Sequence, residues 1–378
     1  MRKRFRAIAA ASPTRAILLS TIWFSIFVYA GRPLLAGAAA IGASRGLAWG
    51  VLIALSLLPL LPLATRRGHF IGYAVLALFS TLLVLTLAGD LARGVYALAR
   101  WAISAQTWPI LDPRAVSLTI LAAAGGLSLV GWMQARCPRV RRVDVAVDDL
   151  PTELEGYRIA QISDVHVGPT IRRRFVQELV EKTNALDADM IAITGDLVDG
   201  HVDDLRDEVA PLRDLRARDG VFYVTGNHEY YWGASEWIPA LEDLGLVFLK
   251  NAHRKIERGN ARLAIAGVTD PVGRDAHKQD LDAALRGTEG LITVLLSHRP
   301  QTAKAAAARG VHLQLSGHTH GGQFFPWNLM IKRFQPVVAG LHRVGRTWLY
   351  VNRGTGYWGP PSRLAVGGEI TVIRLTRA

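Results

Sequence analysis

The first third of the chain is dominated by long runs of hydrophobic residues with few polar interruptions. The runs cover residues 16–30 (extendable through 34–43), 47–65, 70–88 and 115–134. A helix needs about 20 apolar residues to cross the roughly 30 Å hydrocarbon core of a bilayer, and the last three runs have about that length. Soluble helices this long would show a polar face. We therefore predict an all-α transmembrane region of about four helices within residues 1–142.

Two parts of this region allow other interpretations. The first run follows the basic start Met1–Arg6 and also fits a signal peptide, although three further runs follow and no small-residue cleavage site is evident. Residues 90–114 mix arginines with Trp101 and Trp108, a combination typical of the membrane–water interface. We predict an interfacial segment there rather than a further span.

The basic residues are concentrated in the apolar third. Residues 1–142 contain 16 of the 44 Lys and Arg but only two of the 31 Asp and Glu, so the remainder is nearly neutral. This distribution favours contact with anionic lipid headgroups over nucleic-acid binding. Basic residues precede the first run, join the second to the third and follow the fourth. With four spans, the positive-inside rule places both termini in the cytoplasm, whereas an odd number would reverse the orientation. The single cysteine, Cys137, permits no intramolecular disulfide and fits a reducing compartment.

After residue 142 the pattern changes to short apolar runs that alternate with amphipathic stretches. We predict strands at 143–147, 157–163, 190–194, 221–225, 263–266, 292–297, 311–315, 348–351 and 370–375. We predict helices at 171–186, 203–215, 236–244, 278–285 and 302–308, and Pro211 makes the end of the second helix uncertain. Such alternation indicates an α/β domain, here over residues 143–378.

Polar groups that can bind metal ions follow several of these strands. The groups are Asp164-Val165-His166, Gly195-Asp196, Gly226-Asn227-His228-Glu229, His298, and Gly317-His318-Thr319-His320. Ligand sites in open α/β sheets form at the carboxyl ends of strands. Carboxylate, imidazole and amide groups together suit Mn²⁺, Fe²⁺ or Zn²⁺, and the absence of thiolates argues against a structural zinc finger.

These five blocks, in this order, resemble the calcineurin-like metallophosphoesterase superfamily, whose pattern is D-x-H, G-D, G-N-H-[DE], a lone His and G-H-x-H. The stretches 317–323 and 352–356 resemble its membrane-associated bacterial branch. The resemblance implies a β-sandwich flanked by helices and a pair of divalent metal ions. It implies Asp164, His166, Asp196 and His320 as ligands of one ion, and Asp196, Asn227, His298 and His318 as ligands of the other. It also implies that His228 is catalytic and contacts the substrate phosphoryl group.

The same resemblance implies a phosphoester hydrolase. Together with the predicted anchor, it favours a phosphodiesterase or pyrophosphatase in the cell inner membrane, with membrane lipids as partners and no nucleic acid or protein partner predicted. A lipid-linked substrate such as UDP-2,3-diacylglucosamine fits the predicted anchor. A general phosphodiesterase, a phospholipid phosphatase and an inactive membrane sensor or scaffold remain alternatives. Glu229 is interpreted either as orienting His228 or as a helix-start carboxylate. His201 could face the site, Arg299 could contact phosphate, and His312 is expected to be structural.

Overall fold

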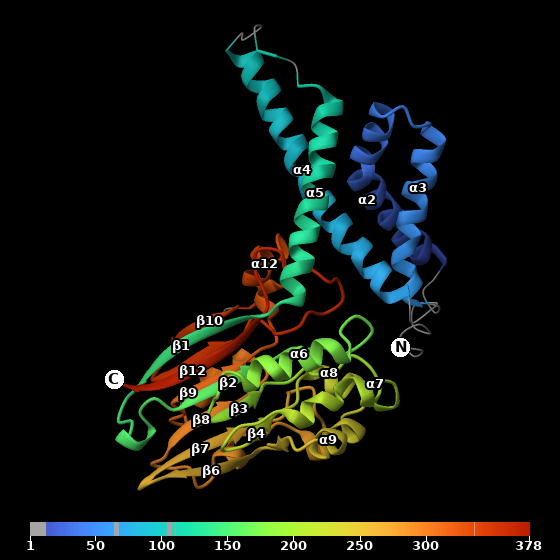
Figure 1. Cartoon of the computed structure of the whole chain (residues 1–378). Coiled ribbons are helices and arrows are strands. Elements are labelled where there is room, and N and C mark those ends of the chain that lie inside the picture. The colour runs from blue at the N-terminus through green and yellow to red at the C-terminus, as the bar shows by residue number, and fades with distance from the viewer. Residues whose placement is uncertain (1–12, 64–67, 104–107, 110, 336) are drawn as a thin grey trace. The chain divides into compact units, whose positions relative to one another are not determined.

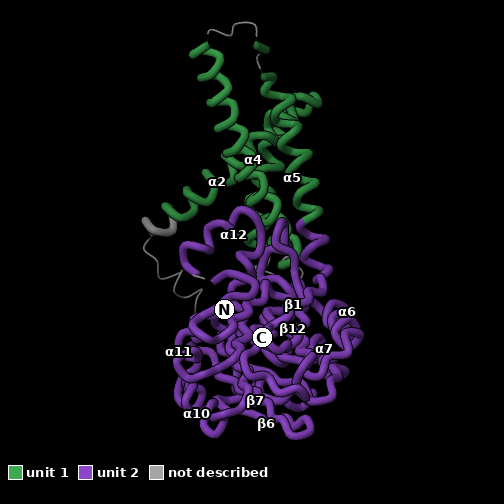
Figure 2. The backbone as a smooth tube through the Cα atoms, turned by 90° about the vertical axis from the view of Figure 1, so that its left-hand side faces the viewer, with its two compact units in different colours: residues 1–130 green, residues 131–378 purple. Residues whose placement is uncertain are grey.

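The computed structural model describes residues 13–63, 68–103, 108–109, 111–335 and 337–378. The chain divides into two compact units, residues 1–130 and 131–378 (Figure 2). The division falls inside the helix α5 (Pro113–Arg136), so residues 131–136 of this helix belong to the second unit. The predicted domain extents, 1–142 and 143–378, stay a prediction.

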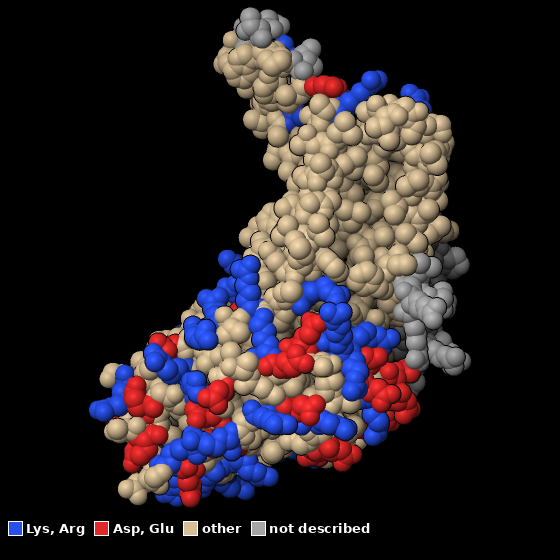
Figure 3. Space-filling model, in the orientation of Figure 1, with Lys and Arg blue, Asp and Glu red and all other residues tan. Residues whose placement is uncertain are grey.

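The first unit is helical, and its described helices are α2 (Pro13–Ala40), α3 (Arg45–Leu57), α4 (Gly68–Ala102) and the larger part of α5 (Pro113–Arg136). Three segments are long and apolar enough to cross a membrane: Ile17–Ala40, His69–Ala102 and Pro113–Arg136. On the face shown in Figure 3 the helical unit is largely uncharged, whereas residues 131–378 display interspersed acidic and basic side chains.

The second hydrophobic run differs from the prediction. It forms the 13-residue helix α3 followed by the 3₁₀ helix η1 (Leu58–Leu63), which contains Pro59 and Pro62. Proline removes a backbone donor and interrupts the α-helix. At 1.5 Å per residue α3 is about 20 Å long, less than the roughly 30 Å hydrocarbon core. The described residues therefore give three candidate spans and one shorter apolar helix instead of about four spans.

The segment predicted to be interfacial also differs, because α4 continues through its first part to Ala102. Asp90 accepts a hydrogen bond from Tyr29 at 2.7 Å and pairs with Arg93 at 2.6 Å, and it also pairs with Arg32. These contacts satisfy the carboxylate within the helical unit. Residues 104–107 and 110 of the predicted segment lie outside the described residues.

The second unit contains two six-stranded sheets (Figure 1). The first has the order β1-β12-β2-β3-β4-β5, and the second has the order β10-β11-β9-β8-β7-β6. The first sheet is formed by β1 (Arg139–Val147), β2 (Arg158–Ile162), β3 (Met190–Ile193), β4 (Val221–Tyr223), β5 (Val247–Phe248) and β12 (Glu369–Arg377). The second is formed by β6 (Ala252–Arg258), β7 (Ala261–Gly267), β8 (Ile292–Leu296), β9 (Leu313–Ser316), β10 (Gly340–Val344) and β11 (Thr347–Val351). Strands β2 to β5 run parallel, as do β7, β8, β9 and β11.

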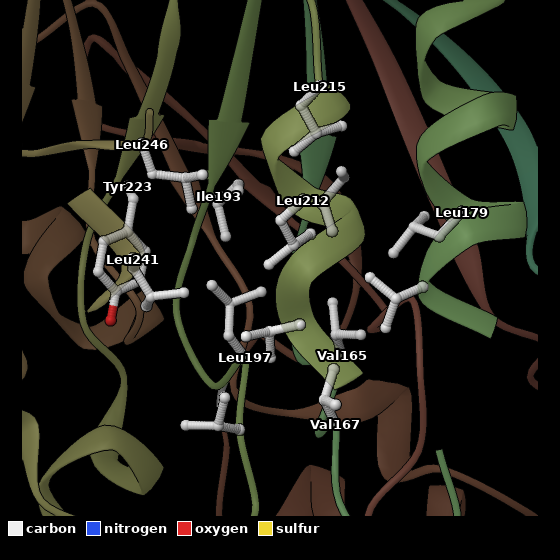
Figure 4. Packing of buried hydrophobic residues seen from close by; sticks show 14 of the residues in the cluster. Val165, Val167, Leu179, Ile193, Leu197, Leu212, Leu215, Tyr223, Leu241 and Leu246 are labelled. Carbon is white, nitrogen blue, oxygen red and sulfur yellow. The ribbon is translucent and has the colours of Figure 1, made fainter. Parts of the chain in front are cut away.

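The sheets face each other across one hydrophobic core, and helices cover their outer faces. The shared core includes Ile159 and Phe222 of the first sheet and Leu263 and Val294 of the second. The outer face of the first sheet packs against α6 (Arg173–Asn184), α7 (Val202–Val209) and α9 (Ala234–Glu242), as Figure 4 shows for part of this core. Helices α10 (Leu281–Leu285) and α11 (Ala303–Ala307) cover part of the second sheet. The predicted α/β sandwich flanked by helices is confirmed.

Candidate metal centre

The predicted ligands leave two sheets from the carboxyl ends of parallel strands. Asp164 and His166 follow β2, and Asp196 follows β3. The other four follow β4, β8 and β9: Asn227, which begins the helix α8 (Asn227–Tyr231), His298, His318 and His320. All seven are buried or partly buried. The sandwich brings the two groups together because both sheets end at the same edge, which is where sites form in such sheets.

Asp196 lies between two pairs of histidines. Its Oδ2 is 3.2 Å from His298 Nε2 and 3.9 Å from His166 Nε2. His298 Nε2 lies 3.1 Å from His318 Nδ1, and His166 Nε2 lies 3.0 Å from His320 Nε2. Three groups could each hold an ion: Asp164 with His166 and His320, Asp196 with His298 and His318, and Asp196 with His166 and His228. The first two match the predicted ligand sets, and the third adds His228; the assignment of ligands to metal ions stays a prediction.

The local contacts of three predicted ligands fit metal binding. His298 Nδ1 donates to the carbonyl oxygen of Thr194 at 2.8 Å, which leaves the Nε2 lone pair directed at the cluster. His166 Nδ1 lies 3.2 Å from Asp199 Oδ2 but forms no hydrogen bond among the described residues, and its Nε2 faces Asp196 and His320. The buried Oδ1 of Asn227 has no hydrogen-bond partner among the described residues. A buried acceptor without a donor is costly, and a cation would satisfy it.

His320 follows a different pattern. Arg363 Nη2 lies 3.1 Å from its Nδ1, and a guanidinium can only donate. Nδ1 therefore accepts, and Nε2 carries the ring proton unless a cation replaces it. Arg363 is fully buried, and its guanidinium also donates to the carbonyl oxygens of His320, Arg353 and Gly356. It thereby links the loop that holds His320 to the segment before β12.

The ionisation of the cluster reflects a concentration of buried charge. Burial disfavours the charged ring of His298, but the Asp196 carboxylate outweighs it and raises the pKa of His298 to about 10. Burial also disfavours the charged ring of His166, but Asp199 outweighs it and raises the pKa of His166 to about 9. Burial and the neighbouring His298 lower the pKa of His318 to about 3. Protons on two histidines thus balance the buried carboxylates, and divalent cations compete with protons at such sites.

Asp199 is a residue of this site that the sequence analysis missed. Its Oδ1 is hydrogen-bonded to His228 Nδ1, while its Oδ2 faces His166. The pKa of Asp199 is lowered by His166 and His228, although burial opposes this. His228 Nε2 lies 4.0 Å from Asp196 Oδ2, so the ring bridges Asp199 and the metal cluster. The sequence does contain a signal for Asp199, because it is a carboxylate that lies three residues after Asp196 and directly follows two apolar residues.

Backbone geometry at the site is unusual. Five predicted ligands have positive φ between 52° and 73°: Asp164, His166, Asp196, His318 and His320. This region is uncommon for residues other than glycine, costs of order 1 kcal/mol or more each, and concentrates at functional sites. Gly226 allows a close backbone approach, because a Cβ there would overlap the Asp196 carboxylate.

Glu229 joins two of the ligand loops. Its carboxylate accepts hydrogen bonds from the backbone N–H groups of Gly226, Asp196 and Leu197. The first of these completes a capping arrangement at the start of α8. The helix-start interpretation is therefore confirmed, and no contact with His228 by this side chain is recorded among the described residues. Burial and Asp196 raise the pKa of Glu229 to about 7.

Three other residues considered from sequence have structural contacts. His201 precedes α7 and packs edge-on against Trp232. Arg299 pairs with the buried Asp270 at 2.8 Å. His312 accepts a hydrogen bond at Nδ1 from the backbone of Thr293, which confirms its structural role.

Several known proteins are similar to this chain. The family model for calcineurin-like phosphoesterases matches residues 157–322. A transmembrane protein with a metallophosphoesterase domain from Danio rerio is 39% identical over 276 residues, which cover 70% of this chain and 62% of that protein. The chain thus spans less than two thirds of this relative. Among solved structures, a Thermus thermophilus sulfate thiohydrolase aligns with 16% identity and a TM-score of 0.38, over 60% of this chain and 58% of that one.

A second relative is matched over most of its length. An uncharacterized metallophosphoesterase from Campylobacter jejuni is 32% identical over 323 residues, which cover 82% of this chain and 84% of that protein. Residues 143–378 make up less than two thirds of the chain, so a match over 82% of it must include part of the apolar third. The chain therefore belongs to the calcineurin-like metallophosphoesterase family.

Proposed function

We propose that this protein is a membrane-anchored phosphoester hydrolase that uses two divalent metal ions. The observation that supports it best is the position of Asp196 between two histidine pairs, with Oδ2 within 4 Å of nitrogens from both. One ion would be held by Asp164, His166, Asp196 and His320, and the other by Asp196, Asn227, His298 and His318. A carboxylate with two oxygens can bridge two cations about 3.5–4 Å apart.

The chemistry follows from these groups. Divalent cations bound there would polarise a phosphoryl oxygen and supply a water molecule that ionises near neutral pH. His228 is placed to donate a proton to the leaving oxygen, because Asp199 holds its Nδ1 and leaves Nε2 facing the cluster. The rings of Tyr231 and Trp358 lie 5.3 and 5.9 Å from the His228 ring and form a wall beside it.

We further propose an amphiphilic substrate, with UDP-2,3-diacylglucosamine as the leading candidate. The apolar helices support this choice, because they would hold the site near lipid substrates. A general phosphodiester and a phospholipid phosphomonoester are the alternative substrates. An inactive sensor or scaffold is less favoured, because the complete set of seven side chains is gathered at one place.

Hydrolysis by the purified full-length protein tests the proposal. With Mn²⁺ present, we expect cleavage of bis-p-nitrophenyl phosphate and faster cleavage of UDP-2,3-diacylglucosamine, and loss of both on chelation. Asp196→Asn should abolish both reactions, whereas Asp148→Asn, at a partly exposed ion pair with Arg343, should not. Cleavage of the generic diester alone would remove the lipid substrate but keep the enzyme class. Absence of metal-dependent cleavage would refute the proposed activity.

We propose that the second unit lies on the cytoplasmic side of an inner membrane, because Arg136, Arg139, Arg141 and Arg142 follow the last candidate span. If α3 does not cross the bilayer and the number of spans is three, these arginines would still favour this side, and the N-terminus would then lie on the opposite side. Cys137, the only cysteine in the sequence, is exposed at that position. A membrane-impermeant thiol reagent should therefore label it only after cells are permeabilised. Labelling of intact cells would reverse the orientation.

A further inference from the structure

A group of exposed apolar side chains lies on one loop of the second unit. The loop, residues 325–334, contains the short helices α12 (Trp327–Met330) and η7 (Ile331–Arg333). Phe334 is 75% exposed and Leu329 is 56% exposed, and the other large apolar side chains exposed on the loop are Phe325, Trp327 and Met330. Such a density of exposed aromatic and aliphatic groups marks an interaction surface.

The loop is connected by hydrogen bonds to the end of a candidate membrane span. The Phe325 N–H donates to the carbonyl oxygen of Leu364 at 3.1 Å, and Arg363, which precedes Leu364, donates its N–H to the carbonyl oxygen of Gly131 at 3.0 Å. Gly131 lies in the last part of α5, which belongs to the same unit as the loop. Both Figure 1 and Figure 2 show α12 at the opposite end of this unit from β6.

The position of Gly131 relates the loop to the bilayer boundary. Arg136 is the first charged residue at this end of α5, and Gly131 precedes it by five residues. At 1.5 Å per residue this corresponds to about 7.5 Å along the helix axis, on the membrane side of Arg136. Arginines at the end of a span lie at the level of the headgroups. Arg363, which contacts Gly131, therefore lies near the membrane–water interface. The loop is hydrogen-bonded to the neighbouring Leu364 and so begins at the same level.

The composition of the loop matches that environment. Tryptophan and phenylalanine are favoured where an apolar layer meets a polar one, and Lys332 and Arg333 are exposed between Met330 and Phe334. Cationic side chains next to apolar ones suit a surface of anionic headgroups. A second copy of the chain would provide apolar surface but would not account for the connection to α5.

We propose that residues 325–334 form a membrane-docking loop that inserts into the interfacial layer of the bilayer, in addition to the anchor formed by the apolar helices. This contact would also position the catalytic site. Gln323, which precedes the loop, exchanges two hydrogen bonds with the backbone of Trp358, at 2.8 and 3.0 Å. Trp358 in turn contacts the His228 ring. If the proposed hydrolase activity holds, the docked loop brings the proton donor close to lipid phosphoesters.

Depth measurement on the full-length protein tests the docking loop. Cys137→Ser removes the native thiol, and Leu329→Cys or Phe334→Cys then introduces a single site for a nitroxide label. The labelled protein is reconstituted in vesicles of phosphatidylcholine and phosphatidylglycerol. The matched control is Arg254→Cys, an exposed position on β6. We expect labels at 329 and 334 to collide less with a water-soluble nickel complex and more with oxygen than the control label does.

Two outcomes would overturn the proposal. Labels at 329 and 334 that respond like the label at 254 would place the loop in water. Labels shielded equally from oxygen and from the nickel complex would place it against protein, such as a second copy of the chain. The measurement does not depend on hydrolysis, so loss of the proposed activity and failure of the docking loop are distinguished.

Discussion

Replacement of Arg363 by methionine tests whether a single buried guanidinium holds the His320 loop in place. The side chain is fully buried and donates to three backbone carbonyl groups, of Gly356, His320 and Arg353. Burial lowers the pKa of Arg363 to about 10, so the group stays charged at neutral pH. Methionine fills a similar volume but leaves the carbonyl oxygens of Gly356 and Arg353 without a donor among the described residues, whereas that of His320 keeps the N–H of Gln323 at 2.9 Å.

The expected cost follows from those acceptors. A buried polar group that loses its partner costs about 1–3 kcal/mol, so the two carbonyl groups would cost roughly 2–6 kcal/mol. Removing the guanidinium recovers part of its own desolvation penalty, which reduces the net cost to about 2–4 kcal/mol. For a domain of this size each kcal/mol shifts the midpoint by about 2–4 °C, and we expect a fall in Tm of about 10 °C. Metal affinity should fall about 10–100-fold, because Arg363 positions the predicted ligand His320.

Thermal unfolding in detergent and metal content by mass spectrometry measure both effects. The matched control is Arg374→Met, since Arg374 forms an exposed ion pair with Asp144 at 2.8 Å. Exposed pairs contribute at most about 1 kcal/mol, so this variant should unfold within a few degrees of the wild type. Arg363→Lys keeps a charge but loses the planar fork, and it should recover only a small part of the stability. Equal Tm values and metal contents for Arg363→Met and Arg374→Met would refute the reasoning.

Three further predictions concern individual side chains. Asp196→Asn should lose bound metal and at least about 100-fold in turnover; an active variant with its full metal content would refute the bridging assignment. His228→Ala should keep its metal and lose about 100–10,000-fold in turnover, with a smaller loss for Asp199→Asn; normal turnover would exclude a role in proton transfer. Burial lowers the pKa of His312 in the folded chain. As the pH drops below about 6.5, the unfolded chain therefore binds a proton at this residue before the folded chain does, and the free energy of unfolding falls. His312→Gln should reduce this dependence by at most about 1.4 kcal/mol per pH unit, measured from Tm against pH; an unchanged slope would contradict it.

The sequence predicts the parts of the fold in which local pattern and burial agree. Strands such as β3 and β8 are buried at every position, and a short run of β-branched and aliphatic residues predicts them well. Strand β6 was not predicted, because it lies at an edge of its sheet and only one of its seven residues is buried. Strand β5 has only two residues and carries no periodicity. The apolar run that became α3 was long enough by composition, and its prolines limited the helix.

The residues of the site also divide into those that a local sequence pattern reveals and those that it does not. Asp164 and His166, or His318 and His320, are recognisable because two ligands occur close together in sequence after a strand. Arg363 gives no such signal, since its importance depends on carbonyl groups that only the folded chain brings around it. Asp199 is intermediate, because it lies near Asp196 in sequence but acts through His228, 29 residues away.

This difference has a physical basis. A metal ligand needs a particular atom type, so a few residue types at strand ends suffice to predict it. A group that positions a ligand needs only a donor or acceptor at the right distance, and many residue types or the backbone can supply one. Thr194, Asp199 and Arg363 each contact a histidine of the cluster, through a carbonyl group, a carboxylate and a guanidinium respectively. Because these partners share no residue type and no spacing, only the folded arrangement of the chain identifies them.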